Sequence, residues 1–153
     1  MASRHVVLSY DGSSRARTAS DKAIALARRH GDTDIVVVCG HDRPPDFSGS
    51  PFLLGLIDET RWQKDWERQT AEDLKHEATR IRLAGVEATV TCSPEDPVRL
   101  LEDVAAKVGA ECIVVPDDGG GLLHDLIIGS SVRRLKRTST VPVVAVCDEH
   151  DRR

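Results

Sequence analysis

A glycine-rich segment late in the chain carries the residues best suited to chemistry. It reads Pro116-Asp117-Asp118-Gly119-Gly120-Gly121, and Gly129-Ser130-Ser131-Val132 follows it. Glycines leave backbone N–H groups open to an anion, and a helix start adds unpaired donors and the positive end of the helix dipole. The hydroxyls of Ser130 and Ser131 lie in the same place. A phosphate could therefore bind between Gly119 and Ser130; the alternative is a flexible turn followed by an ordinary serine N-cap.

Two other segments are expected at the same edge of the predicted sheet. Tyr10-Asp11-Gly12-Ser13 follows the first apolar run, and Cys39-Gly40-His41-Asp42 follows the second. In open α/β sheets, ligands bind beyond the carboxyl ends of the strands, near the point where the strand order reverses. The three segments should therefore converge, although His41 alone is better explained as a solvated loop residue.

Familiar catalytic and metal-binding patterns are absent from the sequence. It contains no G-x-x-x-x-G-K-[ST], and Gly12 does not extend into G-x-G-x-x-G. No nucleophile elbow is visible. The four cysteines are isolated, with no C-x-x-C pair, and are expected to be reduced packing thiols. We therefore predict no catalytic constellation and no metal site.

The elements that position these residues alternate along the chain. Five β-branched runs predict strands at 5–10, 34–39, 86–91, 112–115 and 141–146. The run at 86–91 alternates apolar and polar residues, which is typical of an edge strand, whereas the others indicate strands buried on both faces. The pattern predicts an α/β fold with a mostly parallel sheet.

Helical patterns fill the intervals between these runs. The first has an alanine-rich stripe from Ala16 to Ala27, with Ser13 or Ser14 as N-cap. The second is longer and more charged and ends near Gly85. The third begins at Asp96-Pro97 and ends at Gly109. A short last helix is expected over about 131–137.

Length and composition limit the classes of function. The chain has 153 residues, which suits a single domain over 1–153, with its core at 4–147 and a polar tail at 148–153. A net charge of −4 and 3% aromatic residues argue against nucleic-acid and membrane binding. Without a signal peptide or a membrane span, we expect a cytoplasmic protein. Residues 42–58 look like a long loop whose apolar patch either packs on the domain or forms a lid or partner surface.

Several of these features together resemble the universal stress protein family. They are Asp-Gly-Ser after the first strand, the Asp-Pro helix start, Ala-Glu-Cys-Ile-Val-Val, and Gly-Ser-Ser-Val followed by Val-Pro-Val-Val-Ala-Val. The family's G-x2-G-x9-G-[ST] nucleotide motif aligns with Pro116-x2-Gly119-x9-Gly129-Ser130, which keeps the spacing. The resemblance implies a Rossmann-like three-layer sandwich of the adenine nucleotide alpha hydrolase type, with a five-stranded parallel sheet in the order 3-2-1-4-5.

The same resemblance implies a binding site and a function. Adenine and ribose would lie near Asp11 and the backbone of Gly40, and phosphates near Gly119, Gly129, Ser130 and Ser131. The protein would then be an ATP-binding regulatory module of the stress response rather than an enzyme. It departs from the family at Pro116, Asp117 and Asp118, where two carboxylates would repel phosphate unless Mg²⁺ intervenes. The alternative is a dimeric interaction protein of the same family with a vestigial pocket.

The fifth predicted strand, 141–146, should lie at an edge of the sheet. A long apolar edge favours aggregation unless it is paired or covered. By the family resemblance, two copies would pair these strands antiparallel across a two-fold axis. The alternative is a monomer in which residues 42–58 or the tail cover the edge.

Overall fold

The computed structural model of the protein describes residues 3–40, 59–93, 95–117 and 129–147. Five parallel strands form one sheet in the order β3-β2-β1-β4-β5, as predicted. The strands are β1 (Arg4–Ser9), β2 (Thr33–Gly40), β3 (Ala88–Ser93), β4 (Cys112–Asp117) and β5 (Val143–Cys147). The strand order reverses beside β1, so the switch point lies between β1 and β4.

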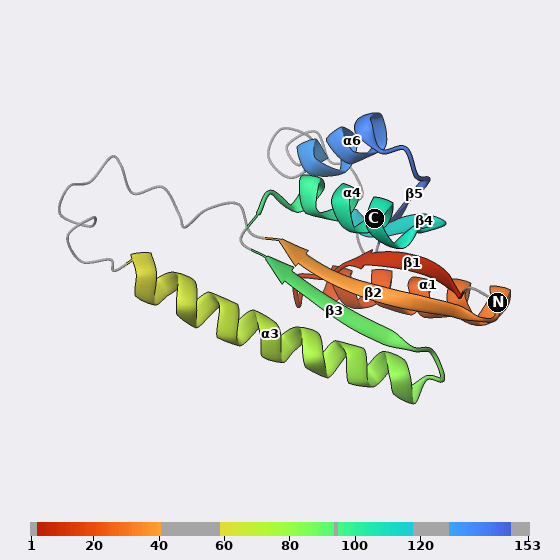
Figure 1. The fold of residues 1–153 in the computed structure, drawn as a ribbon, viewed down its shortest axis with the longest axis horizontal. Coiled ribbons are helices and arrows are strands. Elements are labelled where there is room, and N and C mark those ends of the chain that lie inside the picture. The colour runs from red at the N-terminus through yellow and green to blue at the C-terminus, as the bar shows by residue number, and fades with distance from the viewer. Residues whose placement is uncertain (1–2, 41–58, 94, 118–128, 148–153) are drawn as a thin grey trace.

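Four described helices cover the sheet in two layers. They are α1 (Ser14–His30), α3 (Glu59–Leu83), α4 (Pro97–Val108) and α6 (Gly129–Thr138). The first two pack on one face of the sheet and the last two on the other (Figure 1). This is the arrangement that right-handed β-α-β crossovers produce on either side of a switch point.

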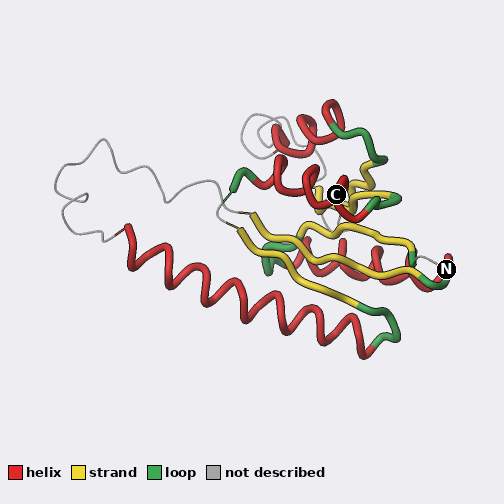
Figure 2. The backbone as a smooth tube through the Cα atoms, in the orientation of Figure 1, coloured by secondary structure: helices red, strands yellow, loops and turns green. Residues whose placement is uncertain are grey.

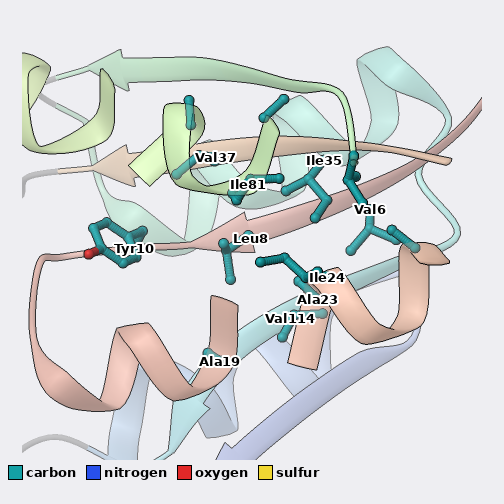
Figure 3. Close-up of a cluster of buried hydrophobic side chains, with 14 of the residues drawn as sticks. Val6, Leu8, Tyr10, Ala19, Ala23, Ile24, Ile35, Val37, Ile81 and Val114 are labelled. Carbon is teal, nitrogen blue, oxygen red and sulfur yellow. The ribbon is translucent and has the colours of Figure 1, made fainter. Parts of the chain in front are cut away.

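Alternation along the central strand divides the core into two clusters. Val6 and Leu8 face α1 and α3, whereas Val7 between them faces α4 and α6. All three side chains are buried, so β1 is covered on both faces as its unbroken apolar run predicted. Figure 3 shows the first cluster, in which the small Ala19 and Ala23 of α1 lie against the aliphatic side chains of the strands.

The predicted helix ends are largely confirmed. Ser13 is the N-cap of α1, and its hydroxyl accepts from the N–H of Ala16 at 3.1 Å. Asp96 caps α4 by accepting from Val98 N at 3.2 Å, and Gly109 ends that helix in the left-handed conformation. The last helix begins at Gly129, two residues earlier than predicted.

Two strands begin two residues later than predicted, for different reasons. Val86 belongs to the turn after α3, where its N–H bonds to the carbonyl of Ile81, so β3 starts at Ala88. Before β5, the N–H of Val141 bonds to the Ser139 hydroxyl and Pro142 has no N–H to give. Pro142 still contributes its carbonyl, which accepts from Ile113 N at 2.9 Å.

The long helix α3 extends beyond the sheet. In Figure 2 its first half runs past the ends of β2 and β3, on the side where those strands finish. Side chains of α3 can therefore reach the carboxyl ends of the strands. In the described part of the chain, no helix has the length and apolar character that crossing a membrane requires.

Candidate functional site

A cleft of about 250 Å³ opens at the carboxyl ends of β1 and β2. Its lining comes from three places: the end of β1 and the following turn, the end of β2, and the α3 helix. The residues are Tyr10, Asp11, Gly12, Cys39, Gly40, Trp66, Thr70, Asp73 and Leu74. The cleft thus lies at the sheet edge where the sequence predicted a ligand site, and it contains two of the predicted contacts, Asp11 and Gly40.

Backbone hydrogen bonds hold the turn after β1 in a defined shape. The N–H of Tyr10 bonds to Val38 O at 3.0 Å, so this residue remains tied to β2 after the regular strand has ended. The Asp11 carboxylate accepts from Ser13 N at 2.9 Å. Gly12 has a φ of +84°, which a side chain would disfavour. The Asp11 carboxylate is thereby kept at the start of α1, on the wall of the cleft.

Gly40 has a packing role that the sequence did not predict. A Cβ at this position would lie 2.8 Å from Pro97 Cα and 3.0 Å from Glu95 O. The backbone at the start of α4 can approach the end of β2 this closely only because residue 40 is glycine. Gly40 therefore both lines the cleft and permits the close contact between β2 and α4.

The α3 wall of the cleft was missed by the sequence analysis. Trp66, Thr70 and Asp73 lie three or four residues apart and so share one face of the helix. Leu74 continues that face into the core, where it is buried. The sequence feature that could have revealed this wall is the pair of polar residues Thr70 and Asp73, which interrupt the apolar stripe of the helix.

Next to the cleft lies a buried carboxylate, Glu77, whose charged partners are partly exposed. Glu77 of α3 is only 2% exposed and pairs with Arg80, with an Nη2–Oε1 distance of 2.7 Å. It also accepts from the Ser20 hydroxyl of α1, and Arg80 reaches Asp21 of α1 at 2.9 Å. Burial opposes ionisation of Glu77, but the hydrogen bonds from Arg80 and Ser20, together with the charges of Arg80 and Arg17, hold its pKa below the usual range. The network joins α1 to α3 and so supports two sides of the cleft.

The negative charge of Glu77 also acts on Tyr10, a residue that lines the cleft. Tyr10 is buried, and its burial followed by the negative charge of Glu77 raises the pKa of its phenol. Tyr10 is therefore a neutral phenol at the cleft wall, and its hydroxyl lies within hydrogen-bonding reach of Arg17 and Glu77.

The electrostatics of the cleft favour hydrogen-bond donors over anions. Its charged lining residues are Asp11 and Asp73, and both are acidic. Burial, and then the nearby Cys92 thiol and the carboxylates of Asp11 and Asp73, raise the pKa of the Cys39 thiol to about 12. Hydroxyl and amino groups of a ligand fit such a cleft, whereas a phosphate inside it would be repelled.

The other predicted contacts lie elsewhere. Gly129, Ser130 and Ser131 form the first turn of α6. Gly119 lies outside the described residues, as do Asp118, His41 and the loop 42–58. Pro116 and Asp117 are the last two residues of β4 and pair with Val146 and Cys147 of β5. Within the described ranges, no three His, Cys, Asp or Glu side chains are grouped to hold a metal ion, and all four cysteines are free.

Comparison with known proteins finds one family throughout. The sequence model of the Universal stress protein family matches residues 2–146. A curated relative from Thermus aquaticus, the universal stress protein in the QAH/OAS sulfhydrylase 3′ region, is 30% identical over 149 residues. That match covers 92% of this chain and 96% of the relative.

Solved structures share the fold at lower sequence identity. A universal stress protein family member from Burkholderia pseudomallei superposes with a TM-score of 0.70 at 24% identity, covering 93% of this chain and 94% of that one. A universal stress protein in complex with cAMP has a TM-score of 0.69 at 22% identity. One from Archaeoglobus fulgidus in complex with dAMP has a TM-score of 0.66, also at 22% identity. The last two matches each cover 95% of this chain and 98% of the other.

Proposed function

The chain belongs to the universal stress protein family, and from this premise we propose that it is a regulatory module that binds an adenine nucleotide. The observation that carries the proposal is the acidic cleft at the ends of β1 and β2. The dAMP and cAMP complexes of two proteins with this fold support the class of ligand. ATP is the nucleotide we propose for this chain.

The two ends of the nucleotide would lie in different surroundings. Adenine and ribose offer N–H and O–H donors, which suit the carboxylates of Asp11 and Asp73 and the Tyr10 hydroxyl. The phosphates would lie outside this acidic cleft, towards the first turn of α6 at Gly129, where backbone N–H groups and the helix dipole favour an anion. Asp117 ends β4 and so lies at the same edge of the sheet as the cleft. Its carboxylate would repel the phosphates, and Mg²⁺ would be needed to offset that charge.

The division between nucleoside and phosphate ends predicts two kinds of variant. Asp73→Asn should weaken adenosine, AMP and ATP alike, by about ten- to a hundredfold, because a charged hydrogen bond contributes about 1.5–3 kcal/mol. Gly129→Glu should weaken ATP strongly and leave adenosine nearly unchanged. Isothermal titration calorimetry with each of the three ligands, with and without Mg²⁺, measures both effects.

A neighbouring residue supplies the control. Glu72 is exposed on the same turn of α3 and does not line the cleft, so Glu72→Gln should bind all three ligands like the wild type. If wild type and Asp73→Asn bind the three ligands with equal affinity, the nucleoside does not bind in this cleft. If the wild type gives no heat with any of the three ligands, the protein would be the non-binding alternative.

That alternative is a dimeric interaction protein of the same family. The observation that favours it is the charge of the site, since Asp11, Asp73 and Asp117 are all acidic. In both cases we propose a homodimer paired through β5 and a protein that acts by binding rather than catalysis. We also propose a cytoplasmic location, because four free cysteines suit a reducing compartment.

A further inference from the structure

Two cysteines lie side by side on neighbouring strands, one on β2, which ends at the cleft, and one on β3. Cys39 of β2 and Cys92 of β3 are direct register partners, one pair before the end of the ladder at Gly40 and Ser93. Partners in neighbouring parallel strands point to the same face of the sheet. That face is the α3 side, since Cys39 packs on the core cluster of α1 and α3, and the pKa of Cys92 is raised first by partial burial and then by the charge of Glu67 of α3.

The spacing of the two cysteines suits a covalent bond. Neighbouring strands lie about 4.7–4.9 Å apart, and disulfides join Cα atoms about 4.4–6.8 Å apart. The pair also lies one register position before the last pair of this ladder, Gly40 and Ser93, so few ladder hydrogen bonds lie beyond it.

The other two cysteines have no such neighbour in the described part of the chain. Cys112 begins β4 and pairs with Val6, whereas Cys147 ends β5 and pairs with Asp117. Five residues of strand, roughly 16 Å, separate the levels of Cys112 and Cys147 in the sheet. These two thiols are therefore internal controls for any effect at Cys39 and Cys92.

We propose that Cys39 and Cys92 are a dithiol–disulfide switch that is oxidised by low-molecular-weight disulfides such as glutathione disulfide. The Cys92 thiolate attacks one sulfur of the oxidant, forms a mixed disulfide and releases one glutathione thiolate. The Cys39 thiolate then attacks the Cys92 sulfur and releases the second glutathione. The protein loses two protons and two electrons, and the oxidant gains both as two molecules of glutathione.

The exposure of the two thiols sets the order of these steps. Cys92 is exposed, whereas Cys39 is half-buried at the cleft wall. Burial raises the pKa of the Cys39 thiol to about 12, and partial desolvation followed by the charge of Glu67 raises that of Cys92, so the pair is a protonated dithiol at neutral pH and exchanges slowly. Cys92 is therefore the thiol that meets the oxidant, and Cys39 is the resolving thiol.

Oxidation would also change the cleft, a consequence that rests on the proposed nucleotide site. Cys39 lines the cleft, so a bond to Cys92 would move its sulfur towards β3 and tie the end of β2 to the edge strand. Nucleotide affinity should then differ by about fivefold or more between the reduced and oxidised protein. By thermodynamic linkage, bound nucleotide would shift the redox equilibrium of the pair by the same factor.

Mass spectrometry of the full chain tests the switch without reference to nucleotide. Reduced protein is equilibrated with glutathione buffers of increasing oxidised fraction, trapped with an alkylating reagent and digested. We expect two alkylated cysteines instead of four, a loss of two hydrogen atoms at the pair that is not alkylated and, after digestion, a peptide linking Cys39 to Cys92. In Cys39→Ser, the exposed Cys92 should instead accumulate a glutathione adduct, because the resolving thiol is missing.

Further variants separate this reaction from general thiol oxidation. Cys112→Ser and Cys147→Ser should form the Cys39–Cys92 bond as the wild type does, whereas Cys92→Ser should lose it. If the pair remains unlinked in pure glutathione disulfide, or if the linked peptide contains Cys112 or Cys147, the switch is wrong. Calorimetry with AMP on the reduced and oxidised forms then tests the coupling alone; equal affinities would overturn the coupling and leave the disulfide standing.

Discussion

At the scale of single residues, Glu77 shows how charge can be buried beside a cleft without remaining unpaired. Its carboxylate receives hydrogen bonds from Arg80 and Ser20 and the more distant charge of Arg17, whose Nε lies 3.8 Å from Oε2. Removal of a charge from water is costly unless partners of this kind replace the water. The network therefore stabilises the contact between α1 and α3 only while every partner is present.

Glu77→Gln tests this network with little change in side-chain size. The amide cannot balance Arg80 and places N–H groups against other donors, so the free energy of unfolding should fall by about 1–3 kcal/mol. Urea denaturation at pH 7 measures the loss, with the exposed Glu72→Gln as the control expected within about 0.5 kcal/mol of wild type. A loss of the same size in both variants would show that the buried network contributes nothing specific.

The same carboxylate predicts a pH dependence. Because the pKa of Glu77 is lowered in the folded protein, its contribution is fully present above the unfolded value near 4.3. It is lost as the pH falls through the lower folded value. The difference in unfolding free energy between wild type and Glu77→Gln should therefore shrink as the pH falls below about 4, and a difference that grows there would contradict this assignment.

At the scale of elements, the junction of β2 and α4 depends on the missing side chain of Gly40. A methyl group there would meet the backbone of Pro97 and Glu95, neither of which is the movable end of a side chain. Gly40→Ala should therefore cost about 1–3 kcal/mol and displace the first turn of α4, which hydrogen exchange at Leu100 N would report. Ser93→Ala, at the register partner, should be near neutral.

The elements that sequence alone predicted well are those with local signals. Asp96 and Gly109 mark helix ends through hydrogen bonds within a few residues and were assigned correctly, and Ser13 is one of the two serines predicted as the first N-cap. Strand starts were less accurate, because Val86 and Val141 are β-branched residues that bond locally in turns instead of joining the ladder. The preference of valine for strands does not show whether its N–H bonds in a turn or in the sheet.

The candidate site was only half predictable, for a physical reason. Asp11 and Gly40 follow strands, and the carboxyl ends of parallel strands meet at one edge of a sheet. Trp66, Thr70 and Asp73 reach that edge only because α3 extends beyond the sheet, which depends on the length and tilt of a helix in the fold. The pairing of Glu77 with Ser20 and the facing of Cys39 and Cys92 likewise join residues distant in sequence.

At the scale of the whole molecule, the two edges of the sheet differ in character. On the β3 edge, Thr89 and Val90 are exposed. On the β5 edge, all five residues are half-buried, with Val144 packed on the α1 side and Val143 on the α4 side. A charge at Val144 would therefore disturb the core of one subunit and report on stability as much as on association.

A backbone change tests the proposed dimer more directly. The carbonyl of Pro142 points to β4, and the direction of N–H and C=O groups alternates along a strand, so those of Val143 and Ala145 point outward. Ala145→Pro removes one outward N–H and keeps the bonds to β4, whereas Val144→Pro removes an inward N–H and should destabilise the subunit itself.

Sedimentation measures the effect on association. The mass of Ala145→Pro should fall from about twice the chain mass of 16.7 kDa towards that of a single chain, with the thermal unfolding of the subunit retained. Wild-type protein that sediments at 16.7 kDa at tens of micromolar would contradict pairing through β5, and an Ala145→Pro dimer as tight as wild type would move the interface to another surface.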